Sequence, residues 1–167
     1  ADLIILPGSK SVKDDLDWLH QHEWPSAIKR HLRYGGKLIG ICGGFQMLGK
    51  QLKDPNHVES GVDSFEGLGL LNMETTFHSK KHLSRVSAIM RMKCGDSAEV
   101  SGYEIHMGQS TGSALSIPLL QGDGWTDGAI SDDDQIIGTY LHGLFDQAVG
   151  CSMLLHWAGL KNANATD

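Results

Sequence analysis

The chain has 167 residues, a formal net charge of −6, 40% hydrophobic residues and 20% charged residues. These values are typical of one globular domain with a hydrophobic core of its own. The acidic balance argues against a nucleic-acid binder, which usually has a basic face. No apolar run reaches transmembrane length, and Ala1-Asp2-Leu3 lacks the basic start of a signal peptide. We therefore expect no nucleic-acid partner and no membrane partner.

The three cysteines, Cys42, Cys94 and Cys151, are odd in number and show no metal-ligand spacing. We interpret them as reduced thiols of a cytoplasmic protein and expect no metal site.

The first fifty residues alternate apolar runs with helical patterns. Leu3–Leu6 is an apolar run typical of a buried strand, and Lys37–Ile41 is a second one. Between them, we expect Ser11 to cap one helix, Pro25 to break it, and Ser26 to cap another. This order is typical of a parallel sheet covered by helices.

The rest of the chain mixes loops with antiparallel patterns. We expect a loop over residues 54–66, strands within 75–90 and over 100–107, a hairpin of 128–131 with 135–140, and a final helix over 147–158. The predicted fold class is α/β, with an open, mostly parallel, twisted sheet flanked by helices and an antiparallel hairpin near the C-terminus.

Cys42 stands between a predicted strand and a predicted helix, with glycine at positions 40, 43 and 44. This is the arrangement G-x-nucleophile-x-G, a sharp turn that exposes the side chain at the top of a sheet. We expect the positive end of the following helix to favour the thiolate. A lone cysteine is more often a small buried residue, but the glycines favour a nucleophile here.

A thiolate nucleophile needs a base and a site for the oxyanion. Among the nine histidines, His106 and His142 lie at predicted strand ends, where α/β sheets gather their active sites. We predict that His142, which precedes a glycine, is the base; the alternative is a hydrogen-bonded structural histidine. For His106, substrate contact and a structural role both stay open.

The oxyanion site needs two backbone N–H groups. We predict that Gly43 supplies one and that the turn after the first strand supplies the other. Pro7 has no N–H group, so the second donor is Gly8 or Ser9.

The stretch Gly40-Ile41-Cys42-Gly43-Gly44-Phe45-Gln46, with a later histidine, resembles the triad-type, class I glutamine amidotransferase domain. Further stretches resemble the cobyric acid synthases within that class: residues 6–19, 102–108 and 138–146, or LPGSKSVKDDLDWL, GYEIHMG and GTYLHGLFD. Together they run across nearly the whole chain.

The resemblance implies a flavodoxin-like fold of class I over residues 1–167, and glutamine hydrolysis. It implies that Cys42 attacks the glutamine amide and that His142 shuttles the proton. Gly8 and Gly43 would form the oxyanion hole, and Gln46 would line the glutamine pocket. We count His106, from its place at a strand end, as a candidate substrate contact as well.

The resemblance also implies partners. In cobyric acid synthases the ammonia amidates adenosylcobyrinic acid a,c-diamide at its b, d, e and g carboxylates, in cobalamin (vitamin B12) biosynthesis. This ligase step uses ATP. The chain has no P-loop motif. We therefore expect no cofactor in this domain, and ATP, Mg²⁺ and the corrinoid on an N-terminal synthetase domain. We expect the chain to be a fragment without that domain and without the first strand of its own.

One residue departs from the usual pattern of class I. Leu144 stands where a glutamate usually orients the histidine. We expect no carboxylate to replace it, and a backbone carbonyl or water to hold the His142 ring; Glu104 is the alternative. Other functions that stay open are amidation of a different acceptor, such as a cell-wall lipid precursor, a peptidase or chaperone of the same superfamily, and a non-catalytic interaction domain.

Overall fold

The computed structural model describes residues 2–160, apart from the side chain of Lys81. Its central sheet has four strands in the order β1-β2-β10-β9, which are Leu3–Leu6, Lys37–Ile41, Ile136–Thr139 and Ala129–Ile130. The first three are parallel, and β9 pairs with β10 as an antiparallel hairpin. The predicted α/β class, the parallel sheet and the hairpin are confirmed.

Both faces of β2 and β10 are buried, and alternate side chains along each strand point to opposite faces. Leu38 of β2 and Ile136 of β10 belong to one hydrophobic cluster. Their neighbours Ile39 and Ile137 belong to a second cluster. The strands can therefore be apolar throughout, which is the pattern that the sequence shows.

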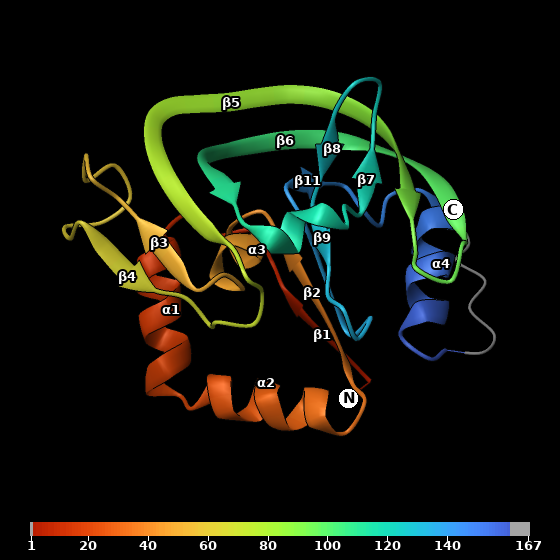
Figure 1. Cartoon of the computed structure of the whole chain (residues 1–167), viewed down its shortest axis with the longest axis horizontal. Coiled ribbons are helices and arrows are strands. Elements are labelled where there is room, and N and C mark those ends of the chain that lie inside the picture. Colours follow the sequence, from red (N-terminus) through yellow and green to blue (C-terminus); the bar gives the residue numbers. More distant parts are fainter. Residues whose placement is uncertain (1, 161–167) are drawn as a thin grey trace.

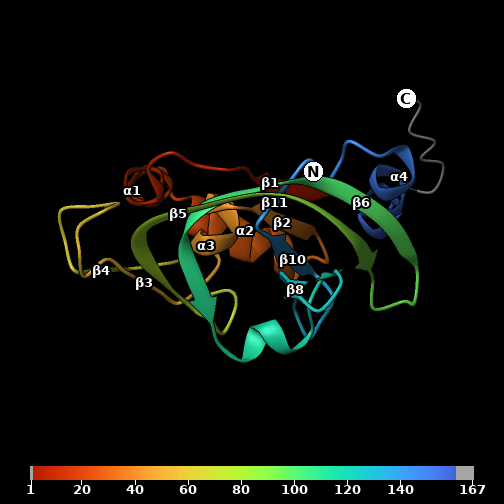
Figure 2. The ribbon, with the colours of Figure 1, turned by 90° about the horizontal axis from the view of Figure 1, so that it is seen from above.

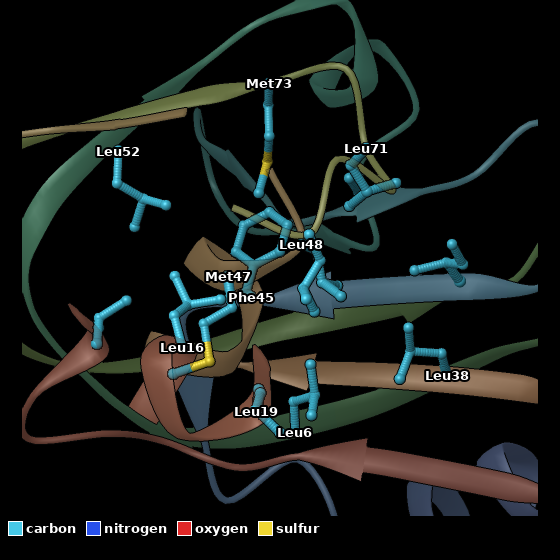
Figure 3. Close-up of a cluster of buried hydrophobic side chains, with 14 of the residues drawn as sticks. Leu6, Leu16, Leu19, Leu38, Phe45, Met47, Leu48, Leu52, Leu71 and Met73 are labelled. Carbon is cyan, nitrogen blue, oxygen red and sulfur yellow. The ribbon is translucent and has the colours of Figure 1, made fainter. Parts of the chain in front are cut away.

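Helices cover the first face. They are α1 (Val12–Gln21), α2 (Trp24–Arg33) and the short α3 (Gly43–Met47). Figure 3 shows Phe45 and Leu48 at the centre of this cluster, with Leu16 on one side and Met73 on the other. Within residues 2–160, no helix is long and apolar enough to cross a membrane.

The starts of these helices differ from the prediction. Ser11 occupies the position before α1, but its hydroxyl bonds Asp14 (2.7 Å) and caps no backbone group. Instead, the carboxylate of Glu59 accepts a hydrogen bond from the Val12 N–H. Pro25 lies in the first turn of α2, where its missing N–H group costs nothing, so it begins this helix and does not precede it.

The second face is covered by a long antiparallel pair. Strands β5 (Glu74–Arg91) and β6 (Ser97–Thr111) arch over the central sheet, as Figures 1 and 2 show. The pair carries short strands along its length: β3 (Gln51–Lys53), β4 (Ser64–Glu66), β7 (Leu120–Gln121), β8 (Thr126–Asp127) and β11 (Leu141–His142). A 3₁₀ turn, Ser113–Ser116, follows β6. Helix α4 (Ala148–Trp157) packs against β6. Strand β4 lies within the span 54–66 that we expected to be loop, so that expectation is wrong for its last three residues.

The chain changes sheets at Tyr140. The strand predicted over residues 135–140 ends at Thr139, and β11 pairs with β6 in the other sheet. Asp127 holds this change of direction, since its carboxylate accepts hydrogen bonds from the Thr139 hydroxyl and, at 2.9 Å, the Tyr140 N–H. His142 therefore lies where the two sheets meet.

Asp54 organises the loop between β3 and β4. Its fully buried carboxylate accepts hydrogen bonds from the N–H groups of Val58 (2.8 Å), Glu59 (2.9 Å) and Ser60 (2.6 Å). Burial raises the pKa of this carboxyl, but the backbone donors outweigh burial, so its pKa lies below the ordinary value. The loop is thus held by one ionised group.

We expect Asp54→Asn to lower the free energy of unfolding at pH 7 by about 1.5–3 kcal/mol, the usual contribution of hydrogen bonds to a charged group. Because the pKa of Asp54 is lowered by folding, its contribution is present above the unfolded-state pKa and is lost as the pH falls through the folded-state value. Urea unfolding of parent and variant at pH 7 and in acid measures the difference. It should shrink in acid, and the exposed Asp96→Asn serves as the control; a difference independent of pH would contradict this account.

Candidate active site

Cys42 occupies a strained turn. Its φ of 51° and ψ of −108° are rare for a residue with a side chain. The flanking glycines are required by close packing: a Cβ atom on Gly40 would lie 2.8 Å from the Phe45 Cα, and one on Gly44 would lie 2.1 Å from the Leu6 carbonyl oxygen. The predicted strand–turn–helix geometry is present, with α3 beginning directly after Cys42.

A pocket of about 520 Å³ opens over this turn. The six residues that the sequence analysis proposed all line it: Cys42, His142, Gly8, Gly43, Gln46 and His106. A hollow of about 600 Å³ lies elsewhere, over Arg91, Glu99 and their neighbours, and contains no cysteine or histidine. The chemistry therefore favours the smaller pocket, while the role of each residue in it stays a prediction.

The Cys42 thiol is held in its protonated form. Burial raises its pKa most, the negative charge of Asp127 raises it further, and the N–H group of Gly43 lowers it only in part. The thiol donates a hydrogen bond to the Ile105 carbonyl (3.2 Å) on β6. Our expectation that the helix start favours the thiolate is wrong for this state, because α3 has only five residues and burial dominates.

His142 lies against the turn that follows β1. A Cβ atom on Gly8 would be 2.8 Å from Cε1 of the ring, so glycine permits this approach. Within residues 2–160 the ring has no hydrogen-bond partner, neither a carboxylate nor the backbone carbonyl that we expected. Glu104 does not reach it, since its carboxylate pairs with Nε2 of His82 at 3.2 Å. The ring nitrogens of His142 are thus open to a ligand in the pocket.

His106 is built into the wall of the pocket. Its Nδ1 bonds the Gly108 carbonyl at 2.7 Å, and its ring stacks on Tyr140 with centroids 3.9 Å apart. Burial lowers its pKa, and the nearby His82 lowers it further. A neutral ring that donates from Nδ1 leaves Nε2 as an acceptor, which suits contact with a substrate N–H group.

The two predicted oxyanion donors lie side by side. A Cβ atom on Gly43 would be 2.8 Å from the backbone nitrogen of Ser9. The Pro7 carbonyl accepts a hydrogen bond from the Gly44 N–H (3.1 Å), which fixes the peptide between Pro7 and Gly8. Among the described residues, the N–H groups of Gly8 and Ser9 have no partner. Both can therefore donate to a ligand.

Gln46 is buried at the base of the pocket. Its Nε2 lies 3.4 Å from the Tyr140 hydroxyl, which in turn bonds the Ser110 hydroxyl at 2.7 Å. A Cβ atom on Gly108 would be 2.5 Å from the same nitrogen, so the amide is closely enclosed. This network fixes one end of Gln46 and supports the pocket floor.

Sequence reasoning missed Asp127 and Glu59. Asp127 carries a partly buried carboxylate whose negative charge acts on Cys42 and His106. Glu59 lines the pocket from the loop after Asp54. Asp127 has no local pattern that marks it. Within residues 2–160, no group of three or more His, Cys, Asp or Glu side chains is arranged to hold a metal ion.

Residues 1–149 match the family model described as the CobB/CobQ-like glutamine amidotransferase domain. The chain belongs to this family. It is also similar to two solved structures. One is a glutamine amidotransferase, at 14% identity and a TM-score of 0.62 over 95% of this chain and 79% of that one. The other is PurLQS from Thermotoga maritima, at 19% identity and a TM-score of 0.57 over 89% of this chain and 72% of that one. At these identities the two structures support the fold, which is that of glutamine amidotransferases.

We expect iodoacetamide to alkylate Cys42 slowly at pH 7, with a rate that rises at a midpoint above the ordinary thiol value. The raised pKa keeps the thiolate scarce at neutral pH. Peptide mass spectrometry over a pH series measures the rate at this residue, and Cys42→Ser gives the background. A midpoint below about 8.5, the value for a free thiol, would contradict the expectation.

Proposed function

We propose that this amidotransferase domain hydrolyses glutamine through Cys42 and passes the ammonia to a synthetase partner. The observation that carries the proposal is the strained turn of Cys42, which opens into a pocket with His142 at its rim. Strain of this kind is kept where the side chain must be presented to a substrate. A structural cysteine needs neither the strain nor the pocket.

The chemistry follows from the groups present. The Cys42 sulfur attacks the carbon of the glutamine side-chain amide, and its proton passes to His142. The N–H groups of Gly43 and of Ser9 or Gly8 stabilise the oxyanion of the tetrahedral intermediate. His142 returns the proton to the amide nitrogen, the C–N bond breaks, and ammonia leaves. Water, deprotonated by His142, then cleaves the thioester to glutamate and restores the thiol.

The structure supports a site that rests in an inactive form. The thiol is protonated, and it donates to the Ile105 carbonyl and not to His142. The peptide between Gly8 and Ser9 has no hydrogen bond within the described residues, so it can turn and present or withdraw the Ser9 donor. The peptide before it is fixed by the bond from Gly44 to Pro7. Losing one oxyanion donor slows acyl transfer by about a hundred- to a thousand-fold.

For the acceptor, we propose adenosylcobyrinic acid a,c-diamide, amidated at its b, d, e and g carboxylates, as in cobyric acid synthases. Support comes from the stretches at 6–19, 102–108 and 138–146, which resemble those enzymes across the chain. ATP, Mg²⁺ and the corrinoid would bind a synthetase domain, because this chain has no loop for ATP phosphates. Amidation of a different acceptor, such as a cell-wall lipid precursor, is the alternative.

We expect a diazo-ketone analogue of glutamine to label Cys42 alone. Cys94 is exposed and Cys151 half-buried, and neither lines the pocket. Peptide mapping by mass spectrometry locates the adduct, and excess glutamine should protect against it. An adduct on Cys94 or Cys151 in place of Cys42 would overturn the assignment.

We expect His142→Ala to lower kcat for glutamate release by about two to four orders of magnitude, as is usual for a general acid–base group. His106→Ala should chiefly raise KM, because this ring lines the pocket wall. Steady-state glutamate release over a range of glutamine concentrations separates the two effects. The reverse pattern, with His106→Ala inactive and His142→Ala active, would mean that the two roles are exchanged.

We expect this chain alone to release glutamate slowly and to amidate nothing. Adding a synthetase domain of a cobyric acid synthase, ATP and the corrinoid diamide should raise glutamate release. Equal turnover in all conditions would exclude the coupling. Amidation of the corrinoid by this chain alone would refute its assignment as the donor side, and stimulation only by a different synthetase and acceptor would replace the corrinoid.

A further inference from the structure

We propose that Glu59 and Lys10 bind the two charges of the α-amino-acid head of glutamine, Glu59 the ammonium and Lys10 the carboxylate. This inference rests on the proposed function and adds the residues that select a free amino acid. It starts from the charges of the pocket. Among the described residues that line it, the formally charged side chains are one lysine and one glutamate, beside the two histidines. A zwitterion needs one partner of each sign.

Hydrogen bonds fix both the backbone and the side chain of Glu59, although it lies in a loop. The buried carboxylate of Asp54 holds the N–H groups on both sides of it, from Val58 to Ser60. The side chain is then fixed by the start of α1, where it accepts a hydrogen bond from the Val12 N–H. A half-buried carboxylate is thereby held against the pocket in one position. The backbone of Lys13 also donates to this carboxylate. A carboxylate has about four lone-pair sites, so these two bonds leave acceptors for an ammonium group.

Lys10 supplies the opposite charge from the segment just before α1, and its side chain is exposed. Its ammonium has no ion-pair or hydrogen-bond partner within residues 2–160, although its residue lines the pocket. It follows directly after the turn of Gly8 and Ser9, which carries the proposed oxyanion donors. One continuous segment, residues 8–10, would thus contact both the α-carboxylate and the side-chain amide of the same glutamine molecule.

The remaining wall fits the aliphatic part of glutamine. Val12, Phe77 and Met107 line the same pocket, and the first two are buried. Apolar side chains can cover the methylene groups while the charged residues hold the head and Cys42 faces the amide. A purely structural role for Glu59, as the cap of α1, would explain its bond to Val12, and the experiments below separate that role from binding of an ammonium group.

The parent protein gives the first test, through the covalent adduct with the diazo-ketone analogue of glutamine. In this step the Cys42 sulfur bonds the diazo carbon, that carbon takes the thiol proton, and N₂ leaves. Glutamine should protect Cys42 from the analogue. Glutaramate, which lacks the α-ammonium, and 4-aminobutanamide, which lacks the α-carboxylate, should protect at least tenfold less well.

Two variants give the second test. Glu59→Gln keeps an acceptor for Val12 and removes the charge, and Lys10→Met keeps the chain length and removes the ammonium. Each should lower the rate of labelling by the analogue about ten- to a hundred-fold, as expected for one charge-assisted hydrogen bond. Each should leave labelling of Cys42 by iodoacetamide, which has no charged head, unchanged. Lys53→Met and Glu74→Gln, a half-buried pair 2.5 Å apart outside the pocket, are matched controls.

The variants should also change which protectant is favoured. In Glu59→Gln the preference for glutamine over glutaramate should fall, and in Lys10→Met the preference over 4-aminobutanamide should fall. The opposite pairing would reverse the two roles and so overturn the proposal as stated. Unchanged labelling by the analogue in both variants would also overturn it and leave glutamine hydrolysis standing. If the analogue gives no adduct on Cys42 of the parent protein, the proposed function itself fails. Should Glu59→Gln not fold, Lys10→Met and the protection series decide the matter.

Discussion

The active-site region depends on one close approach between two stretches of backbone. The Gly44 N–H donates to the Pro7 carbonyl, and the space that a Cβ atom of Gly44 would need is filled by the Leu6 carbonyl oxygen. This contact draws the turn after β1 onto the turn after β2. As a result, Ser9 lies against Gly43 and Gly8 lies against His142. Groups from three separate strands meet over one sulfur atom because these glycines have no side chain.

The features that sequence predicted are those with a local cause. Leu3–Leu6 is apolar and Lys37–Ile41 is mostly apolar, as is typical of a parallel sheet, and both are strands. The glycines around Cys42 marked its turn, because only glycine tolerates such packing. The two strand-like runs at 128–131 and 135–140, with the turn between them, identified the hairpin of β9 and β10. In each case the residues that decide the structure lie within a few positions of one another.

The features that escaped prediction are decided by residues far apart in the chain. Glu59 caps α1 in place of the nearby Ser11, over a separation of 47 residues. Asp127 turns the chain at Tyr140, so the strand that seemed to continue to His142 is divided between two sheets. The raised pKa of the Cys42 thiol could not be inferred from the glycines or from the helix start, because its main cause is burial, which is a property of the assembled protein. No window of sequence contains these causes.

Strand β6 links the thiol to the proposed base. It carries the Ile105 carbonyl that accepts the Cys42 thiol, and it pairs with β11, the strand of His142. His106, the next residue of β6 after Ile105, stacks on Tyr140, the residue at which the chain changes sheets. A shift of β6 would therefore alter the acceptor of the thiol proton and the position of the imidazole together.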